Sequence, residues 1–557
     1  MSTTAPDQSA TSSVTKEATV ATIQDVDMDE TKVTEPLQTA VSSATTTKDD
    51  ADATNSARKQ KAKERLTKNK YEQSQFEGIK DAEGNILPKS ERKPKRKCAV
   101  MLGYCGTGYN GLQIQNDPNV KTIERDLYTA LHKAGAISLE NSLDLKKSGF
   151  QRCARTDKGV HAAGNVVSLK MIIEDPEIKE KINEHLPQQI RIWGIQRTTK
   201  GFDCRKMCSS RVYEYLLPTY SLLNPKPHTK LAQLVDEKMA QNPQLFQEDD
   251  GEGAQFWKDV RQQVLDSGVS QEQLDAVDNY YATAALENPL SSRQAPLASG
   301  ESTPVPSDIE PIIKKIKQLE SKARRSYRIS PTKLAHFRQA MQQYEGTHNF
   351  HNFTVGKTYK SPDSSRYIIS AKVSEPFVID DSENSSHATE WVSVKIHGQS
   401  FMLHQIRKMI CMAALTVRCK LPAEKLLAMC FKPEKLNIPK APALGLLLEN
   451  PVFDAYNKIL QENSYEPINF EQYEKEMLDF KMKNIYDKIY NDEVKENTFV
   501  SFFGYIDAYN VAGSEEDTTG GNNNNNNNNN GSSIFDFLHN YIDQETATKV
   551  EAESATK

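Results

Sequence analysis

The chain has 557 residues and a formal net charge of −5, and 37% of its residues are hydrophobic. Its length allows several domains of ~150 residues each, whereas the lack of an apolar run of about 18 residues argues against a membrane span. Eight cysteines without a disulfide-like spacing favour reduced thiols, and the small net charge excludes no nucleic-acid partner because acidic and basic segments are separated along the chain.

Residues 1–96 are expected to form a tail without a packed core. Residues 1–57 are acidic, rich in Ser, Thr and Ala, and free of aromatic side chains. Basic clusters follow at 58–63 and 92–97, a pattern typical either of nuclear-localisation signals or of a solvated linker. We favour the first interpretation because two clusters occur, and we therefore expect the protein in the nucleus. The acidic start also differs from the Arg-rich transit peptides of mitochondrial proteins.

Residues 97–220 are expected to form the first of two folded halves. Ile123, Leu127 and Leu131 recur at helical spacing and predict a helix over 122–134. Strands are predicted on either side of this helix, at 98–104, 149–153, 165–172, 190–199 and 211–218. The order β-α-β-β predicts an α+β fold with a mixed or antiparallel sheet.

Residues 221–330 interrupt this pattern. They are polar and acidic, with a Pro/Ser-rich stretch and a helix predicted over 312–325. We interpret them as an insert between the two halves that lies mostly at the surface and is partly disordered.

Residues 331–455 are expected to form the second half. Leu334, Phe337 and Met341 mark one face of a helix that ends at Gly346. Further elements are predicted as strands at 367–378 and 391–396 and as a helix at 403–418.

Two segments follow the second half. Residues 456–510 are charged and aromatic, and we expect a helical extension packed on the outside of the fold. Residues 511–557 include an uninterrupted asparagine run at 522–530, and we interpret them as a low-complexity tail.

The turn predicted between the second and third strands has an unusual composition for a loop between two apolar runs. It carries one acid, Asp157, among Arg155, Lys158 and His161, and Gly159 can adopt a positive φ. Positive neighbours favour the ionised carboxylate, which suits a nucleophile or base that acts on a polyanion. The alternative is an ordinary β-turn with solvated charges.

The surrounding motifs favour the first of these readings. Residues 155–162, Arg-Thr-Asp-Lys-Gly-Val-His-Ala, resemble the catalytic signature of the TruA-type pseudouridine synthases, in which the Asp is catalytic. Three further segments resemble, in order, the family's Tyr-x-Gly-x-x-Tyr-x-Gly-x-Gln-x-Gln loop, its Arg-x-Tyr-x-Tyr strand and its Phe-Leu-x-His-x-x-Arg helix start, namely 104–115, 211–215 and 401–407. Shorter matches occur at 346–353 and 441–446, so the likeness spans 97–453. Leu112 departs from the pattern, since bacterial members usually carry Trp there.

The resemblance implies a fold and a set of roles. It implies two similar α+β halves whose sheets join edge to edge and flank a central RNA-binding cleft. Asp157 would be the catalytic carboxylate, either attacking C1′ of the uridine or removing a C2′ proton. Tyr213 would stack on the base, although a core aromatic is the alternative. Arg407 would form a bidentate pair with Asp157, although an exposed arginine without a special role is the alternative.

Other residues of the motifs are candidates for substrate binding. Arg155 and Lys158 would contact phosphates. His161 would contact the RNA backbone or cap its turn, and Arg211 would bind phosphate or lie on a strand surface. His404, in the helix-start motif, completes the substrate-binding set.

The sequence contains two weaker indications of other ligands. The loop at 106–111 spells G-x-G-x-x-G, but no helix opens on its last glycine, so a dinucleotide site is a weak match. Cys204 and Cys208 are four residues apart, and a structural zinc is a minor alternative because no full ligand set is legible.

The expected function is therefore an isomerase that converts uridine to pseudouridine without a required cofactor. We expect tRNA as the substrate, at the anticodon stem and anticodon, with small nuclear and messenger RNA as further substrates, and a monomer with no membrane association. Two alternatives remain: a catalytically silent RNA-binding or tRNA-chaperone protein, and a glycosidase. A glycosidase would usually need two carboxylates, and the motif offers one.

Overall fold

The computed structural model describes residues 93–117, 119–138, 141, 146–287, 306–379, 388–509 and 533–555, with backbone only for 281–287 and 549–555. The chain divides into two units, Met1–Pro94 and Lys95–Lys557, and all contacts described below lie within the second. The expected tail at 1–96 and the asparagine run lie almost entirely outside the described residues. None of the described helices is long and apolar enough to cross a membrane.

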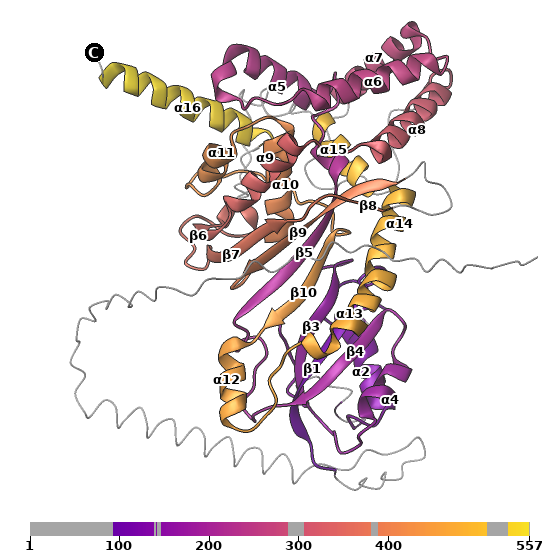
Figure 1. The fold of residues 1–557 in the computed structure, drawn as a ribbon, viewed down its shortest axis with the longest axis vertical. Helices are drawn as coiled ribbons and strands as arrows, with labels where there is room; N and C mark the ends of the chain where they lie inside the picture. Colours follow the sequence, from indigo (N-terminus) through magenta and orange to yellow (C-terminus); the bar gives the residue numbers. More distant parts are fainter. Residues whose placement is uncertain are drawn as a thin grey trace, which may run out of the picture. The chain divides into compact units, whose positions relative to one another are not determined.

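A mixed sheet of ten strands forms the centre of the second unit (Figure 1). Its main path runs in the order β4-β1-β3-β10-β5-β9-β7-β6, while β2 pairs with β3 and β8 pairs with β9. The strands are β1 Arg96–Tyr104, β2 Gln151–Arg152, β3 His161–Met171, β4 Ile190–Arg197, β5 Ser210–Pro218, β6 Gly346–Asn349, β7 Ser365–Val373, β8 Phe377–Ile379, β9 Thr389–Gly398 and β10 Leu446–Val452. The α+β fold with a mixed sheet that the sequence predicts is confirmed.

The two halves join by placing a late strand among early ones. β10, the last strand of the second half, lies between β3 and β5 of the first half. It runs parallel to β3, where Leu447 is opposite His161, and antiparallel to β5, where Leu448 is opposite Tyr213. The strands that carry or follow the three catalytic motifs are therefore neighbours in one sheet.

Helices pack against both parts of the sheet, as Figure 1 shows. The first part carries α2 Ile123–Lys133 and α4 Ile178–His185. The apolar stripe predicted for the helix at 122–134 is fully buried in α2. The second part carries α9 Pro331–Gln342, α10 Gln405–Arg418 and α11 Ala423–Cys430. Nearly every residue of α10 is buried, so this helix lies at the centre of the core of the second half.

The insert contains more structure than its composition predicted. It holds α5 Lys230–Gln241, α6 Glu252–Asp266, α7 Gln271–Glu287 and α8 Glu310–Ser326. The last three share a small apolar cluster of their own, which includes Val264, Leu274 and Ile313. The Pro/Ser-rich stretch expected to be disordered falls mainly on 288–305, outside the described residues.

The C-terminal extension is part of the main core. It comprises α12 Asp454–Glu462, α13 Glu474–Phe480, the π-helical turn η6 Lys481–Tyr486, α14 Asp487–Glu496 and α15 Thr498–Ala508. Phe480 is buried and meets Trp193 of β4 edge to face at 5.3 Å between ring centroids.

The end of the chain differs from the expected low-complexity tail. Asp536–Ala555 form a helix, α16, and the Tyr541 hydroxyl donates a hydrogen bond to the Leu245 carbonyl at 2.9 Å. Phe535, Leu538 and Ile542 are buried against the core. Their spacing of three and four was legible in the sequence, but the neighbouring asparagine run dominated the interpretation.

A buried ion-pair network ties the extension to the sheet. The Lys481 ammonium lies 2.7 Å from the Glu214 carboxylate of β5 and 2.8 Å from that of Glu449 of β10. The Ser393 hydroxyl also donates to Glu214. Burial alone would raise the pKa of Glu214, but the charge and hydrogen bond of Lys481 outweigh burial and lower it to about 2. The ionised state of Glu214, which neighbours Tyr213 on β5, therefore depends on Lys481 of the extension.

Lys481→Met should destabilise the protein by about 3–5 kcal/mol, because it leaves a buried carboxylate unpaired. Urea unfolding at pH 7 measures the change. Lys181→Met is the matched control, since Lys181 of α4 forms a partly exposed ion pair with Asp175, which precedes that helix. A loss no larger than that of the control would contradict the role of Lys481, and adding Glu214→Gln to Lys481→Met should recover part of the stability.

Candidate active site

The Asp157 loop, residues 153–160, connects β2 to β3. The Asp157 side chain is one-third exposed, and its carbonyl accepts a hydrogen bond from the Val160 N–H at 3.1 Å. Gly159 has a φ of +77° and donates its N–H to the Tyr109 carbonyl at 3.2 Å, which ties the turn to the neighbouring loop. The carboxylate thus stands at the surface on a loop whose backbone is fixed.

The glycines of the 106–111 loop allow the two loops to touch. A Cβ placed on Gly106 would lie 2.2 Å from the Val160 carbonyl oxygen, and one on Gly111 would lie 2.7 Å from that of Thr156. Gly111 also has a φ of +86°. These contacts explain the first and last glycines of the G-x-G-x-x-G pattern as close backbone packing against the Asp157 loop, whereas Gly108 has open space around it and a φ of +83°.

Two buried polar side chains hold the Asp157 loop from below. The Tyr104 hydroxyl is 2.9 Å from Thr156 Oγ1, and Asn165 Nδ2 donates to the Tyr104 hydroxyl and to the Ala154 carbonyl, both at 3.1 Å. Burial raises the pKa of Tyr104 to about 12, so the phenol stays neutral. Sequence reasoning placed Tyr104 in a motif but assigned no role to it or to Asn165.

His161 differs from its predicted contact with RNA. The side chain is fully buried, and its Nδ1 accepts a hydrogen bond from the Gly106 N–H at 3.1 Å. Burial lowers the pKa of His161 to about 4, so the ring is neutral at pH 7. The imidazole joins the two loops from inside, which agrees with the second of the two predicted roles, holding the turn, whereas a fully buried ring presents no surface to RNA.

His404 lies against the Asp157 carboxylate. Its Nε2 is 3.7 Å from Asp157 Oδ2, and it precedes α10 with a φ of +64°. That left-handed conformation is uncommon for a residue with a side chain and often occurs at functional sites. Burial and the nearby charge of Lys440 lower the pKa of His404, so the ring is mainly neutral at pH 7.

Arg407 does not form the expected bidentate pair. Its Nε donates to the Ala441 carbonyl at 2.5 Å, and the Ala441 N–H donates to the Arg407 carbonyl at 3.1 Å. Among the described residues, no ion pair within 4.0 Å joins Arg407 to Asp157, although the two charges lie close enough to interact. Burial lowers the pKa of Arg407. The guanidinium therefore anchors the 441–445 loop and contributes positive potential beside Asp157.

Tyr213 lies beside the site and is almost fully buried. Its ring meets Phe401 edge to face at 5.2 Å, and its phenol senses the charge of Asp157. Burial raises the pKa of Tyr213 far above its usual value. The ring packs in the core and lies close enough to Asp157 to sense its charge, while stacking on a base stays a prediction.

Arg211 braces the site through backbone carbonyls. Its guanidinium donates to the carbonyls of Gln399 at 3.1 Å and Cys153 at 3.0 Å, with a longer contact to that of Arg205 at 3.5 Å. These three bonds use three of the five guanidinium N–H donors and fix the orientation of the side chain. Arg211 therefore helps to position the Asp157 loop through the Cys153 carbonyl, and phosphate binding by its remaining donors stays a prediction.

Several cations surround Asp157. Arg155 and Lys158 are exposed, as a phosphate contact requires. Lys440, also exposed, interacts electrostatically with Asp157 and Arg407 and was missed from the sequence. The lysines just before the 441–446 motif could have indicated that a cation lies near Asp157.

A metal site finds no support in the described part of the chain, where no group of three or more His, Cys, Asp or Glu side chains could hold a metal ion. Cys204 is buried, and the Cys208 thiol donates to the Ser210 carbonyl at 3.1 Å. The two thiols proposed from their spacing thus belong to the packing around the Asp157 loop.

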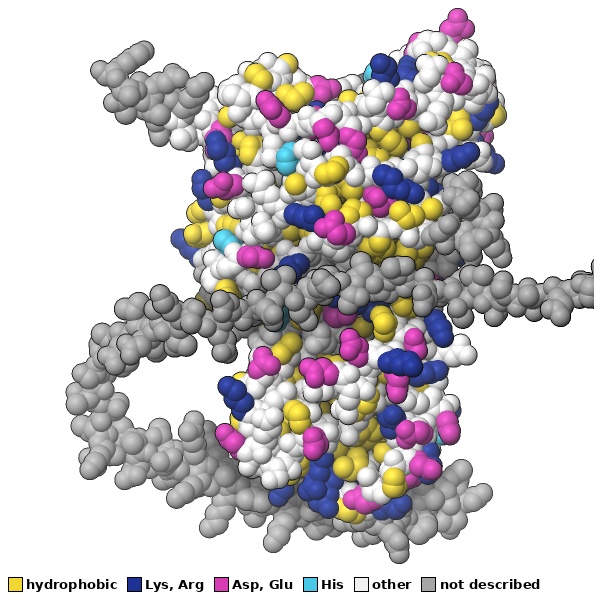
Figure 2. Space-filling view, in the orientation of Figure 1, with side chains coloured by type: hydrophobic (Ala, Val, Ile, Leu, Met, Phe, Trp, Pro, Cys, Tyr) yellow, Lys and Arg dark blue, Asp and Glu magenta, His cyan; other side chains and the backbone are white. Residues whose placement is uncertain are grey.

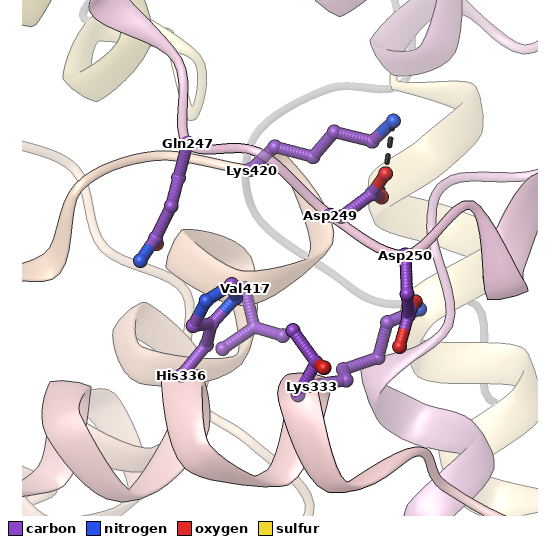
Figure 3. A pocket seen from close by; sticks show the side chains of 8 residues that line it. Gln247, Asp249, Asp250, Lys333, His336, Val417 and Lys420 are labelled. Atoms are coloured by element: carbon purple, nitrogen blue, oxygen red, sulfur yellow. Dashed lines mark ion pairs between the residues drawn. The ribbon is translucent and has the colours of Figure 1, made fainter.

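A small polar pocket lies elsewhere, at the C-terminal end of α10 (Figure 3). It is lined by Gln247, Asp249, Asp250, Thr332, Lys333, His336, Val417 and Lys420. Asp249 pairs with Lys420 at 3.0 Å within it, so its charges are largely satisfied internally. The candidate site is at the opposite end of the same helix. On the face drawn in Figure 2, basic and acidic side chains are interspersed, with no extended area of one sign.

Comparison with known proteins identifies the family of the chain. The sequence profile of a family described as tRNA pseudouridine synthase matches residues 340–454. The chain is 58% identical over 475 residues to tRNA pseudouridine synthase 1 of Candida albicans, covering 85% of this chain and 75% of that protein.

Two Saccharomyces cerevisiae proteins are also similar. The chain is 52% identical over 436 residues to tRNA pseudouridine synthase 1, covering 78% of this chain and 76% of that protein. It is 37% identical over 411 residues to tRNA pseudouridine(27/28) synthase, covering 72% and 97%. On the strength of these matches, which extend well beyond the Arg407 half, the chain belongs to the TruA-type family of tRNA pseudouridine synthases.

Proposed function

We propose that this protein isomerises uridine to pseudouridine in tRNA. The observation that carries the proposal is the single carboxylate, Asp157, held at the surface by a braced loop and bordered by His404, Arg407 and Tyr213. An enzyme with these parts is an RNA-modifying isomerase, in agreement with the names of its relatives.

The reaction breaks the N1–C1′ bond of uridine, turns the base and rejoins it through C5. It involves no net redox change and no added group, so it requires no cofactor. Asp157 supplies the carboxylate, by attack on C1′ or by removal of the C2′ proton. The buried phenol of Tyr213 stays protonated and offers a surface for the detached uracil, while Arg407 and Lys440 hold positive potential around the reacting carboxylate.

The target nucleotide must leave its stack to reach Asp157. Exposed Arg155, Lys158 and Lys440 fit phosphates on both sides of such a nucleotide, and they read charge and shape more than base identity. We therefore propose several targets in the anticodon stem and anticodon, with small nuclear and messenger RNA as further substrates. The greater identity to synthase 1 than to the (27/28) synthase of the same yeast supports assignment to the former group.

Location and assembly complete the proposal. The basic clusters at 58–63 and 92–97 support a nuclear protein, which a fluorescent fusion lacking residues 58–97 would test by losing nuclear import. Asp157, Tyr213 and Arg407 all come from one chain, so no second copy is needed to complete the site.

Asp157→Asn should abolish turnover while leaving tRNA affinity nearly unchanged, because the amide keeps the shape and loses the carboxylate. Release of tritium from tRNA labelled with 5-³H-uridine measures isomerisation directly, since exchange at C5 distinguishes it from RNA binding and from glycosidic cleavage. Loss of an acid–base group typically costs a hundredfold or more. The assignment fails if the variant keeps more than about one-hundredth of the wild-type rate, and the function fails if the wild type releases no tritium.

The intact chain should be a monomer, because α13, η6 and α14 already occupy the sheet face that carries Glu214. Light scattering of the full-length protein over a hundredfold range of concentration should give a single mass near 62.6 kDa. A mass of twice that value, independent of concentration, would show that another surface mediates association.

A further inference from the structure

Two apolar side chains stand exposed at the edge of the site. Leu403 and Val355 have 52% and 51% of their surfaces exposed, the largest values among the big hydrophobic side chains of the described residues. Leu403 immediately precedes His404, and its carbonyl accepts a hydrogen bond from Thr354 Oγ1 at 3.0 Å. The two side chains therefore lie on adjoining loops next to Asp157.

The loop that carries Val355 is held by buried polar groups. Asn352 is fully buried, and its amide donates to the carbonyls of Cys430 at 3.1 Å and Glu434 at 2.9 Å. The Lys408 ammonium of α10 donates to the carbonyls of Asn352 and Thr354, both at 3.2 Å. This backbone cannot turn to bury Val355 without breaking these bonds, so the fold imposes the exposure.

Two apolar side chains that the fold keeps exposed beside the Asp157 site are placed where they can contact the bases of a bound RNA. Extraction of a uridine leaves neighbouring bases with an unstacked face, which is energetically unfavourable. Apolar side chains inserted between base steps are a known way for proteins to fill such a gap. The cations around Asp157 would hold the phosphates on either side.

We propose that Leu403 and Val355 form an apolar wedge that occupies the place of the extracted uridine in the RNA stack. The proposal rests on the proposed function and adds how the substrate is opened. The wedge acts on the bases next to the target and takes no part in bond breaking. Its contribution is therefore largest where the target is paired and stacked, and smallest where the target is already free.

Leu403→Ala with Val355→Ala tests this with two RNA substrates. One is a tRNA whose target uridine is paired in a stem, and the other is the same RNA with a mismatch opposite that uridine. Both substituted side chains are exposed, so the variant should fold, and Ile459→Ala on α12, 44% exposed, is the matched control. Single-turnover tritium release and tRNA affinity are measured for each protein.

The double variant should slow the paired substrate at least tenfold and the mismatched one no more than twofold, with little change in the control. An equal loss on both substrates would assign the side chains to the chemical step and overturn the wedge. No loss on either, or a loss of affinity alone, would also overturn it and leave the surface to another partner. Failure of the wild type on both substrates would instead refute the proposed function.

Discussion

The site depends on the contact between two backbone loops, 105–112 and 153–160, which have no room for side chains at Gly106 and Gly111. Three buried polar residues secure this contact from within, Tyr104, Asn165 and His161. Each is neutral at pH 7 or has no charge to lose, so the support stays constant where the enzyme works. A carboxylate on a fixed loop avoids reorganisation during the reaction, which is the physical basis of preorganised catalysis.

The sheet links the Asp157 loop to the strand that carries Tyr213. Because β10 lies between β3 and β5, the strand that begins at the Asp157 loop and the strand that carries Tyr213 are held by a third strand from the other half. Lys481 pairs with both Glu214 of β5 and Glu449 of β10, so the C-terminal extension is tied to two of these three strands. The packing of the extension therefore supports the strands that position the candidate site.

Much of this could be predicted from the sequence, and the failures have physical causes. Periodicity predicted α2 and the strands β1 and β5, since local pattern sets them. The place of β10 between β3 and β5 depends on long-range pairing that no local pattern encodes. The motifs predicted a bidentate pair of Arg407 with Asp157, whereas the structure places His404 beside Asp157 and turns Arg407 to the Ala441 carbonyl. The burial of His161 and the backbone hydrogen bonds of Arg211 were also not predictable, because a motif carries no information on tertiary contacts. The helix α16 was missed because a low-complexity run adjoins it.

The central claim is that the buried network positions Asp157 for chemistry and not for RNA binding. Tyr104→Phe tests it most directly, because it removes one hydroxyl from beneath Thr156 and leaves the surface unchanged. Single-turnover tritium release and tRNA affinity should be measured together. The account predicts a rate lowered about tenfold, the kinetic equivalent of ~1.4 kcal/mol of barrier, with unchanged affinity. A wild-type rate would contradict it, as would a loss confined to affinity.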